Sequence, residues 1–131
     1  MRDHGVAVSQ GRIVGLAPIK ALQQQYPTFE HTHLEHHIVL PGLVNAHGHG
    51  AMSLMRGVGA GLPLQEWLNE AIWPFEARHM DASAVALGTE LASAEMLLAG
   101  TTTFADMYFF PETVARVAHQ TGMRCQIAAP V

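Results

Sequence analysis

Two histidines separated by one residue, His47 and His49, are the side chains of this chain best placed to do chemistry. They follow the short, mostly apolar stretch 43–46 and precede a glycine-rich segment. Residues two apart in an extended chain point to the same side, so this stretch directs both imidazoles to one place. Neutral imidazole is the commonest protein ligand for zinc-like metals. The pair therefore predicts a metal-dependent enzyme.

Other polar residues compete with this pair for a functional role. His31 and His33 have the same spacing but lie in a polar, histidine-rich segment, so we interpret them as exposed to solvent. A catalytic zinc site takes at least three protein ligands, so His47 and His49 need partners from elsewhere. Asp106 ends a predicted strand, where its carboxylate could reach the metal or brace a neighbouring loop.

The elements expected to position these residues alternate along the second part of the chain. We predict a strand over 43–49, short helices over 63–69 and 71–78, a helix over 81–99, a strand over 101–105, a helix over 111–120 and a strand over 124–129. Asp81 suits the N-cap of the long helix, and Gly100 suits its C-terminal end. The apolar face of this helix is expected to be Ala84, Leu87, Leu91, Ala94 and Leu98.

This order of strands and helices predicts an α/β fold with a parallel sheet and right-handed crossovers. A closed parallel barrel needs eight strand–helix units and at least about 200 residues. The chain holds two units and one further strand, so we expect the first two to three strands of a partial (β/α)8 barrel. Before residue 41 the pattern differs. It predicts a hairpin over 6–14, one helical turn over 20–26 and a domain boundary near Pro41.

Composition narrows the class of protein. Of the 131 residues, 49% are apolar and 14% are charged, which is enough apolar content for a buried core. The net charge is −4 and the seven Lys and Arg residues are scattered, so nucleic acid is not an expected partner. No apolar run approaches the roughly 20 residues of a membrane span, so we expect no membrane association and a cytoplasmic location. The single cysteine, Cys125, lies in an apolar run and is expected to be buried.

Glu76 follows two aromatic residues and a proline in the segment 72–76. A glutamate in this setting is usually an exposed helix carboxylate. The adjacent aromatic residues are also compatible with the wall of a pocket for a flat ligand. The sequence leaves both interpretations open.

The run from Pro41 to His49 resembles the amidohydrolase superfamily, whose members carry His-x-His after the first barrel strand. The segments 62–68, 72–76 and 100–110 are similar to its 5-methylthioadenosine/S-adenosylhomocysteine deaminase branch, among the chlorohydrolase-like and aminohydrolase-like enzymes. The similarity is strong over residues 38–131. Residues 5–37 resemble only the small β-sandwich that flanks the barrel in this superfamily. Gly48 and Gly50 depart from the family, which usually has a larger residue at one or both positions.

The resemblance implies a deformed (β/α)8 barrel that binds one divalent metal, usually zinc, with His47 and His49 as two of its ligands. Glu76 matches the family glutamate that holds the ribose hydroxyls. The other ligands and the catalytic glutamate lie further along in the family, so no catalytic residue is assigned here. On this basis residues 1–40 are part of a flanking β-sandwich and residues 41–131 are the N-terminal part of the barrel.

The function implied by the resemblance is hydrolytic deamination of an adenine nucleoside, in which a metal-activated water replaces the purine amino group with release of ammonia. The expected partner is a small-molecule nucleoside, and homo-oligomerisation of the parent protein is left open. Two alternatives remain. One is a related enzyme acting on a guanine-type base or a triazine. The other is a truncated chain with no activity of its own.

Overall fold

The computed structural model describes residues 3–129, and the chain divides into two compact units between Val39 and Leu40. In the first unit, β1 (His4–Ser9) and β2 (Arg12–Pro18) form an antiparallel hairpin, and α1 (Ile19–Gln25) follows. Gln10 and Gly11, which join the strands, both have positive φ, as a tight hairpin turn requires. The predicted hairpin and helical turn are confirmed.

The histidine-rich segment 31–37 is exposed throughout, as the sequence predicted. His33 lies 3.6 Å from Glu35, and both side chains are more than two-thirds exposed. An ion pair this open to water contributes little to stability.

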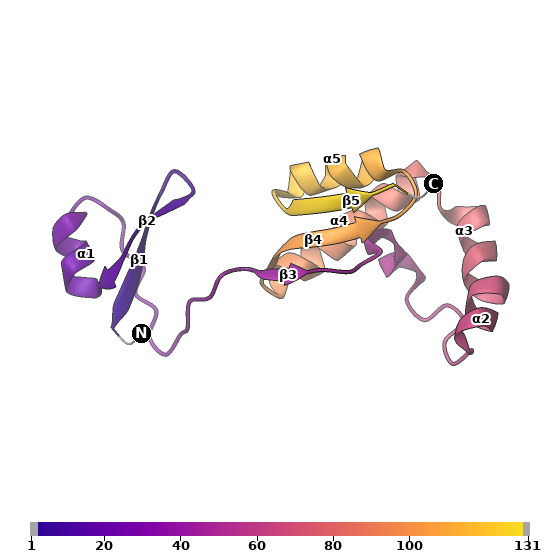
Figure 1. Cartoon of the computed structure of the whole chain (residues 1–131), viewed down its shortest axis with the longest axis horizontal. Coiled ribbons are helices and arrows are strands. Elements are labelled where there is room, and N and C mark those ends of the chain that lie inside the picture. The colour runs from indigo at the N-terminus through magenta and orange to yellow at the C-terminus, as the bar shows by residue number, and fades with distance from the viewer. Residues whose placement is uncertain (1–2, 130–131) are drawn as a thin grey trace. The chain divides into compact units, whose positions relative to one another are not determined.

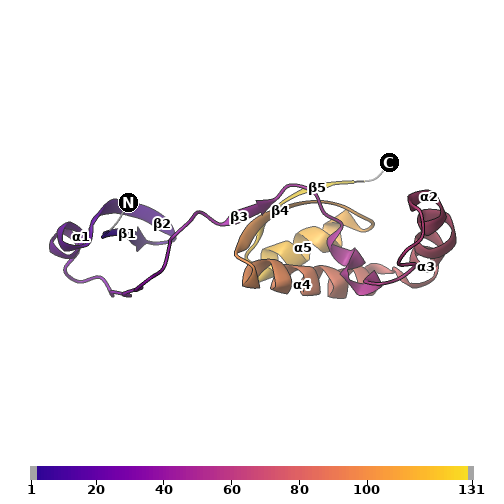
Figure 2. The same cartoon turned by 90° about the horizontal axis from the view of Figure 1, so that it is seen from below.

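The second unit is built on a parallel sheet in the order β3 (Leu43–Asn45), β4 (Thr101–Met107) and β5 (Arg124–Ala128). Helices α4 (Ala82–Leu98) and α5 (Pro111–Thr121) lie together on one side of it (Figure 2). The opposite side carries Val44 and Met107, which are 66% and 49% exposed. The predicted α/β alternation and parallel pairing are therefore confirmed for this unit.

Local interactions explain where α4 begins and where α4 and α5 end. One carboxylate oxygen of Asp81 accepts hydrogen bonds from the backbone N–H groups of Ser83 and Ala84, at 2.9 and 2.8 Å. Gly100 follows α4 with a φ of 84°, and Gly122 follows α5 with a φ of 74°. Glycine adopts this left-handed conformation without the steric cost that other residues carry.

The predicted apolar face of α4 is wrong. The buried residues of α4 are Val85, Gly88, Thr89, Ala92 and Ser93, whereas Leu87 is 58% and Leu98 is 90% exposed. The helix packs through its small residues because the segment that follows the histidine pair lies directly against it. Figure 1 shows this segment, η1 (Gly50–Met55), beside the helix.

The two short helices predicted before α4 form one continuous helical run (Figure 1). It consists of α2 (Leu64–Glu66), a π-helical stretch η2 (Trp67–Ile72) and α3 (Trp73–His79). Pro74 has no N–H to donate, which normally breaks a helix. The π-helical turn, in which the Trp73 N–H bonds to the Leu68 carbonyl, allows the helix to continue through Pro74.

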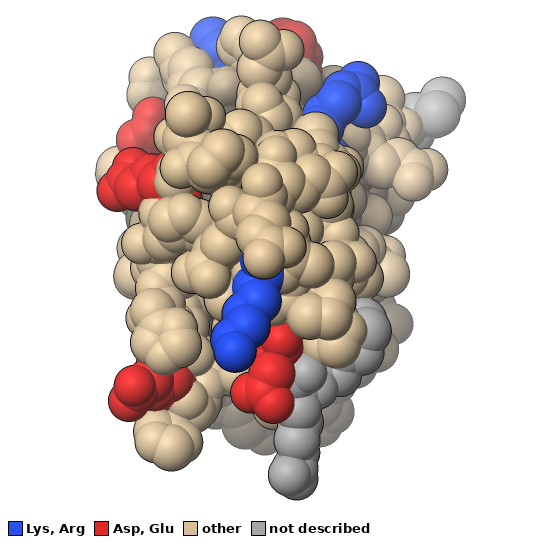
Figure 3. All heavy atoms as spheres, turned by 90° about the vertical axis from the view of Figure 1, so that its left-hand side faces the viewer, with Lys and Arg blue, Asp and Glu red and all other residues tan. Residues whose placement is uncertain are grey.

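Three surface observations complete the description. Cys125 is exposed, contrary to expectation, because it lies on β5 at the edge of the described sheet. The Lys and Arg side chains on the face in Figure 3 are dispersed rather than gathered in a patch. Within residues 3–129, none of the helices has both the length and the apolar character needed to cross a membrane.

Candidate active site

The histidine pair lies just beyond the carboxyl end of β3. The predicted strand over 43–49 is shorter in the structure, ending at Asn45, whose side-chain oxygen accepts a hydrogen bond from the His47 N–H at 3.3 Å. Such local side-chain bonds compete with the sheet ladder and turn the backbone out of it. The pair thus stands at the edge of the sheet where active sites of parallel barrels are found.

The two imidazoles meet edge to face, with ring centres 5.3 Å apart and planes at 79°. Two imidazoles bound tetrahedrally to one ion, at a zinc–nitrogen distance of about 2.1 Å, have ring centres roughly 5 Å apart. The observed spacing therefore fits a shared metal. It also falls within the range of ordinary aromatic pairs, so spacing alone does not define a metal site.

The orientation of His49 is set by the end of β4. Its Nδ1 lies 2.8 Å from the Met107 carbonyl oxygen. A carbonyl only accepts, so Nδ1 carries the proton and the Nε2 lone pair of the neutral ring is free to bind a metal. Metal-binding histidines characteristically donate their other ring N–H in this way.

Asp106 holds the backbone of Gly50, the residue that follows His49. Its Oδ2 accepts a hydrogen bond from the Gly50 N–H at 3.0 Å, and the residue is 4% exposed. Burial raises the pKa of Asp106, although hydrogen bonds from the Gly50 and Met107 N–H groups partly oppose the shift. Of the two roles left open for Asp106, the structure shows the brace.

The part of the chain that the structure describes places no third candidate ligand beside the pair. Within residues 3–129, no group of three or more His, Cys, Asp or Glu side chains is arranged to hold a metal ion. The described chain therefore brings two imidazoles together at this position, and Asp106 supports them through the loop backbone.

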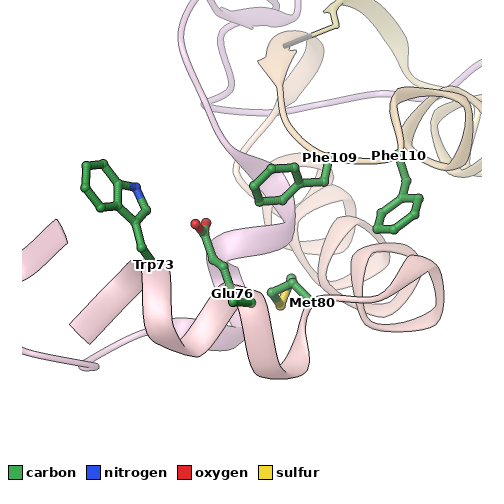
Figure 4. A pocket seen from close by; sticks show the side chains of 6 residues that line it. Trp73, Glu76, Met80, Phe109 and Phe110 are labelled. Carbon is green, nitrogen blue, oxygen red and sulfur yellow. The ribbon is translucent and has the colours of Figure 1, made fainter. Parts of the chain in front are cut away.

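Glu76 lies in the wall of a separate cavity of about 540 Å³. The lining residues are Trp73, Glu76, Ala77, Met80, Phe109 and Phe110. In Figure 4 the Glu76 carboxylate rises from α3 between the rings of Trp73 and Phe109. Of the two interpretations of Glu76, the structure favours the pocket wall: one carboxylate stands among apolar and aromatic surfaces, an arrangement suited to a flat ligand with hydroxyl groups.

Sequence reasoning missed Tyr108, whose hydroxyl donates a hydrogen bond to Glu76 Oε1 at 2.7 Å. The sequence signal for Tyr108 was the alternation of side chains along β4, in which every second residue faces the same side and which continues one residue beyond the strand. Phe104, Asp106 and Tyr108 are 2%, 4% and 6% exposed and share the helix-facing side. Burial and the neighbouring Glu76 carboxylate raise the pKa of Tyr108 well above its ordinary value, so the phenol stays protonated and acts as a donor.

Comparison with known proteins defines the class. Residues 38–131 match the sequence profile of the amidohydrolase family, and the chain belongs to this family. The predicted resemblance to that superfamily is confirmed.

The particular relatives are deaminases. The chain is 47% identical over 126 residues to a 5-methylthioadenosine/S-adenosylhomocysteine deaminase of Saccharophagus degradans, covering 96% of this chain and 28% of the relative. It is 53% identical over 87 residues to a 5'-deoxyadenosine deaminase of Methanosphaera stadtmanae, covering 66% and 20%. The crystal structure of an adenosine deaminase from Xanthomonas campestris with bound zinc superposes with a TM-score of 0.82 at 39% identity, covering 95% and 28%. The chain thus spans less than a third of the length of these relatives.

Proposed function

We propose that the protein carrying this chain is a metal-dependent hydrolytic deaminase of adenine nucleosides, of the 5-methylthioadenosine/S-adenosylhomocysteine type. The observation that carries the proposal is the 47% identity to a deaminase of that name over nearly the whole chain. The aligned region includes the histidine pair and the Glu76 cavity, which are the two features best suited to catalysis or ligand binding.

His47 and His49 are proposed as two ligands of one divalent ion, with Zn2+ as the first choice. The spacing of the rings, the free Nε2 of His49 and the zinc bound in the Xanthomonas campestris relative support this assignment. When bound, the metal supplies a Lewis acid that makes water at the site more acidic. Met107 and Asp106 contribute by fixing the ring and the backbone on either side of the ligand position.

Glu76 is proposed to bind the sugar of the nucleoside. Its carboxylate has several lone pairs and accepts hydrogen bonds from two neighbouring ribose hydroxyls. Trp73 and Phe109 flank it and offer flat apolar surfaces against which a nucleoside packs. A free base has no ribose, so this residue separates a nucleoside deaminase from an enzyme acting on guanine-type bases or triazines.

The proposed architecture follows the same family. The parallel strands β3–β5 are the first strands of a (β/α)8 barrel, and the exposed side of their sheet is the side that a barrel encloses. Residues 41–131 form this part of the barrel. Residues 1–40 belong to a small β-sandwich that flanks it, consistent with the hairpin of β1 and β2.

The test is release of ammonia by the complete gene product that carries this sequence. The substrates are 5-methylthioadenosine, S-adenosylhomocysteine, adenosine and guanine, each tried before and after removal of metal by a chelator. We expect turnover of the nucleosides, loss of turnover on chelation and recovery with Zn2+. Deamination of guanine without turnover of any nucleoside would replace this proposal with its alternative.

A further inference from the structure

Tyr108 is held beside Glu76 by two different parts of its side chain. The ring belongs to the buried core cluster of the second unit, with Ile72, Phe104 and Val114 among its members. The hydroxyl projects from that core to Glu76 on α3, thirty-two residues earlier in the chain. The core therefore fixes the position of a hydrogen-bond donor against Glu76, which lines the cavity.

The hydrogen bond leaves Glu76 partly free. Tyr108 engages Oε1 at 2.7 Å, the usual length of a hydrogen bond from a hydroxyl to an oxygen. In the described part of the chain, no side-chain hydrogen bond to Oε2 is found. Oε2 and a second lone pair on Oε1 remain for a ligand. A free glutamate samples several rotamers and must lose that freedom on binding, whereas a glutamate tied at one oxygen has already lost it.

We propose that Tyr108 is a positioning residue that preorganises the Glu76 carboxylate and thereby sets the preference of the site for ligands with an intact ribose diol. The inference rests on the proposed nucleoside-binding function of this cavity. The hydroxyl is what matters, because a phenylalanine ring fills the same place in the core.

The test compares Tyr108→Phe with the parent in the complete gene product, using 5-methylthioadenosine and its 2′,3′-dideoxy analogue. With 5-methylthioadenosine we expect KM to rise roughly three- to tenfold, because the untied Glu76 side chain must then lose its rotamer freedom on binding. We expect kcat to stay within about twofold, since the removed interaction serves binding rather than the chemical step. With the dideoxy analogue, both constants are expected to match the parent, which also shows that the variant is folded.

Two further variants sharpen the comparison. Tyr26→Phe removes the chain's other tyrosine hydroxyl, which bonds to the Val14 carbonyl in the first unit, and is expected to leave both substrates unaffected. In a Glu76→Ala background, Tyr108→Phe is expected to raise KM no further, because the group it positions is gone.

The outcomes separate the two proposals. A Tyr108→Phe variant with unchanged KM for 5-methylthioadenosine, or with equal losses on both substrates, overturns the role of Tyr108 and leaves the deaminase intact. A parent protein that turns over neither nucleoside refutes the proposed function itself.

Discussion

Gly88→Ala tests whether close packing against α4 positions η1, the segment that follows the histidine pair. A Cβ at Gly88 would lie 2.3 Å from the Ala51 carbonyl oxygen and 2.8 Å from the Ala51 Cα. Ordinary carbon contacts are about 3.5–4.0 Å, so α4 and η1 must separate by roughly 1 Å. Both contacts are backbone atoms, which cannot rotate away, so we take the upper overpacking cost of about 3 kcal/mol. Alanine returns about 1 kcal/mol in helix propensity, and we expect a net loss of about 2 kcal/mol.

The assay is urea unfolding followed by circular dichroism, with Glu90→Ala on an exposed position of α4 as the matched control. Glu90→Ala is expected to change the free energy of unfolding by less than about 0.5 kcal/mol. Because η1 begins at Gly50, beside His49, Gly88→Ala is also expected to weaken metal binding. If Gly88→Ala instead stabilised the protein by about 1 kcal/mol, helix propensity would dominate and the packing argument would be refuted.

Three further perturbations probe the second unit by urea unfolding. Asp81→Ala removes the N-cap of α4 and is expected to cost about 1 kcal/mol, whereas Asp81→Ser retains a capping oxygen and should cost less; equal losses would contradict this. Trp67→Phe removes the indole N–H that donates to the Val58 carbonyl at 2.9 Å and is expected to cost about 1 kcal/mol, and no loss would show that water replaces the bond. Burial raises the pKa of Asp106, so the native state keeps this proton where the unfolded chain has released it. Stability should therefore fall as pH rises from the ordinary aspartate range towards the raised pKa, and Asp106→Asn should reduce this slope; identical slopes would contradict the assignment.

Much of the second unit could be predicted from local signals. Asp81 and Gly100 marked the ends of α4, Pro111 and Gly122 marked α5, and the β-branched run 101–103 marked β4. These features are encoded by residues adjacent in sequence, so no tertiary information was needed. The antiparallel hairpin of the first unit was predicted for the same reason.

The errors arose where long-range packing decides the outcome. The leucines of α4 have helical spacing, yet Gly88 and the other small residues are buried because only they admit the close approach of η1. Two separate short helices were predicted over 63–69 and 71–78, and the π-helical stretch η2 joins them into one continuous run. Cys125 was expected to be buried, but it lies on β5 at the edge of the described sheet, and its position in the sheet depends on tertiary pairing.

The candidate site likewise has one feature that local sequence predicted and others that depend on long-range packing. The spacing of His47 and His49 predicted that the rings would lie together, and they do. No local pattern connects His49 with Met107 or Glu76 with Tyr108, which are 58 and 32 residues apart. Both contacts come from β4 and the residues that follow it, and they depend on how the sheet and α3 pack together.

The most direct test of the central claim is the zinc content of three forms of the complete gene product. The forms are the parent, a His47→Ala/His49→Ala double variant and a His31→Ala/His33→Ala double variant with the same His-x-His spacing in the exposed segment. The account predicts that the parent and the second variant retain one tightly bound zinc ion while the first variant loses it. Retention of zinc by the His47→Ala/His49→Ala protein would contradict the account.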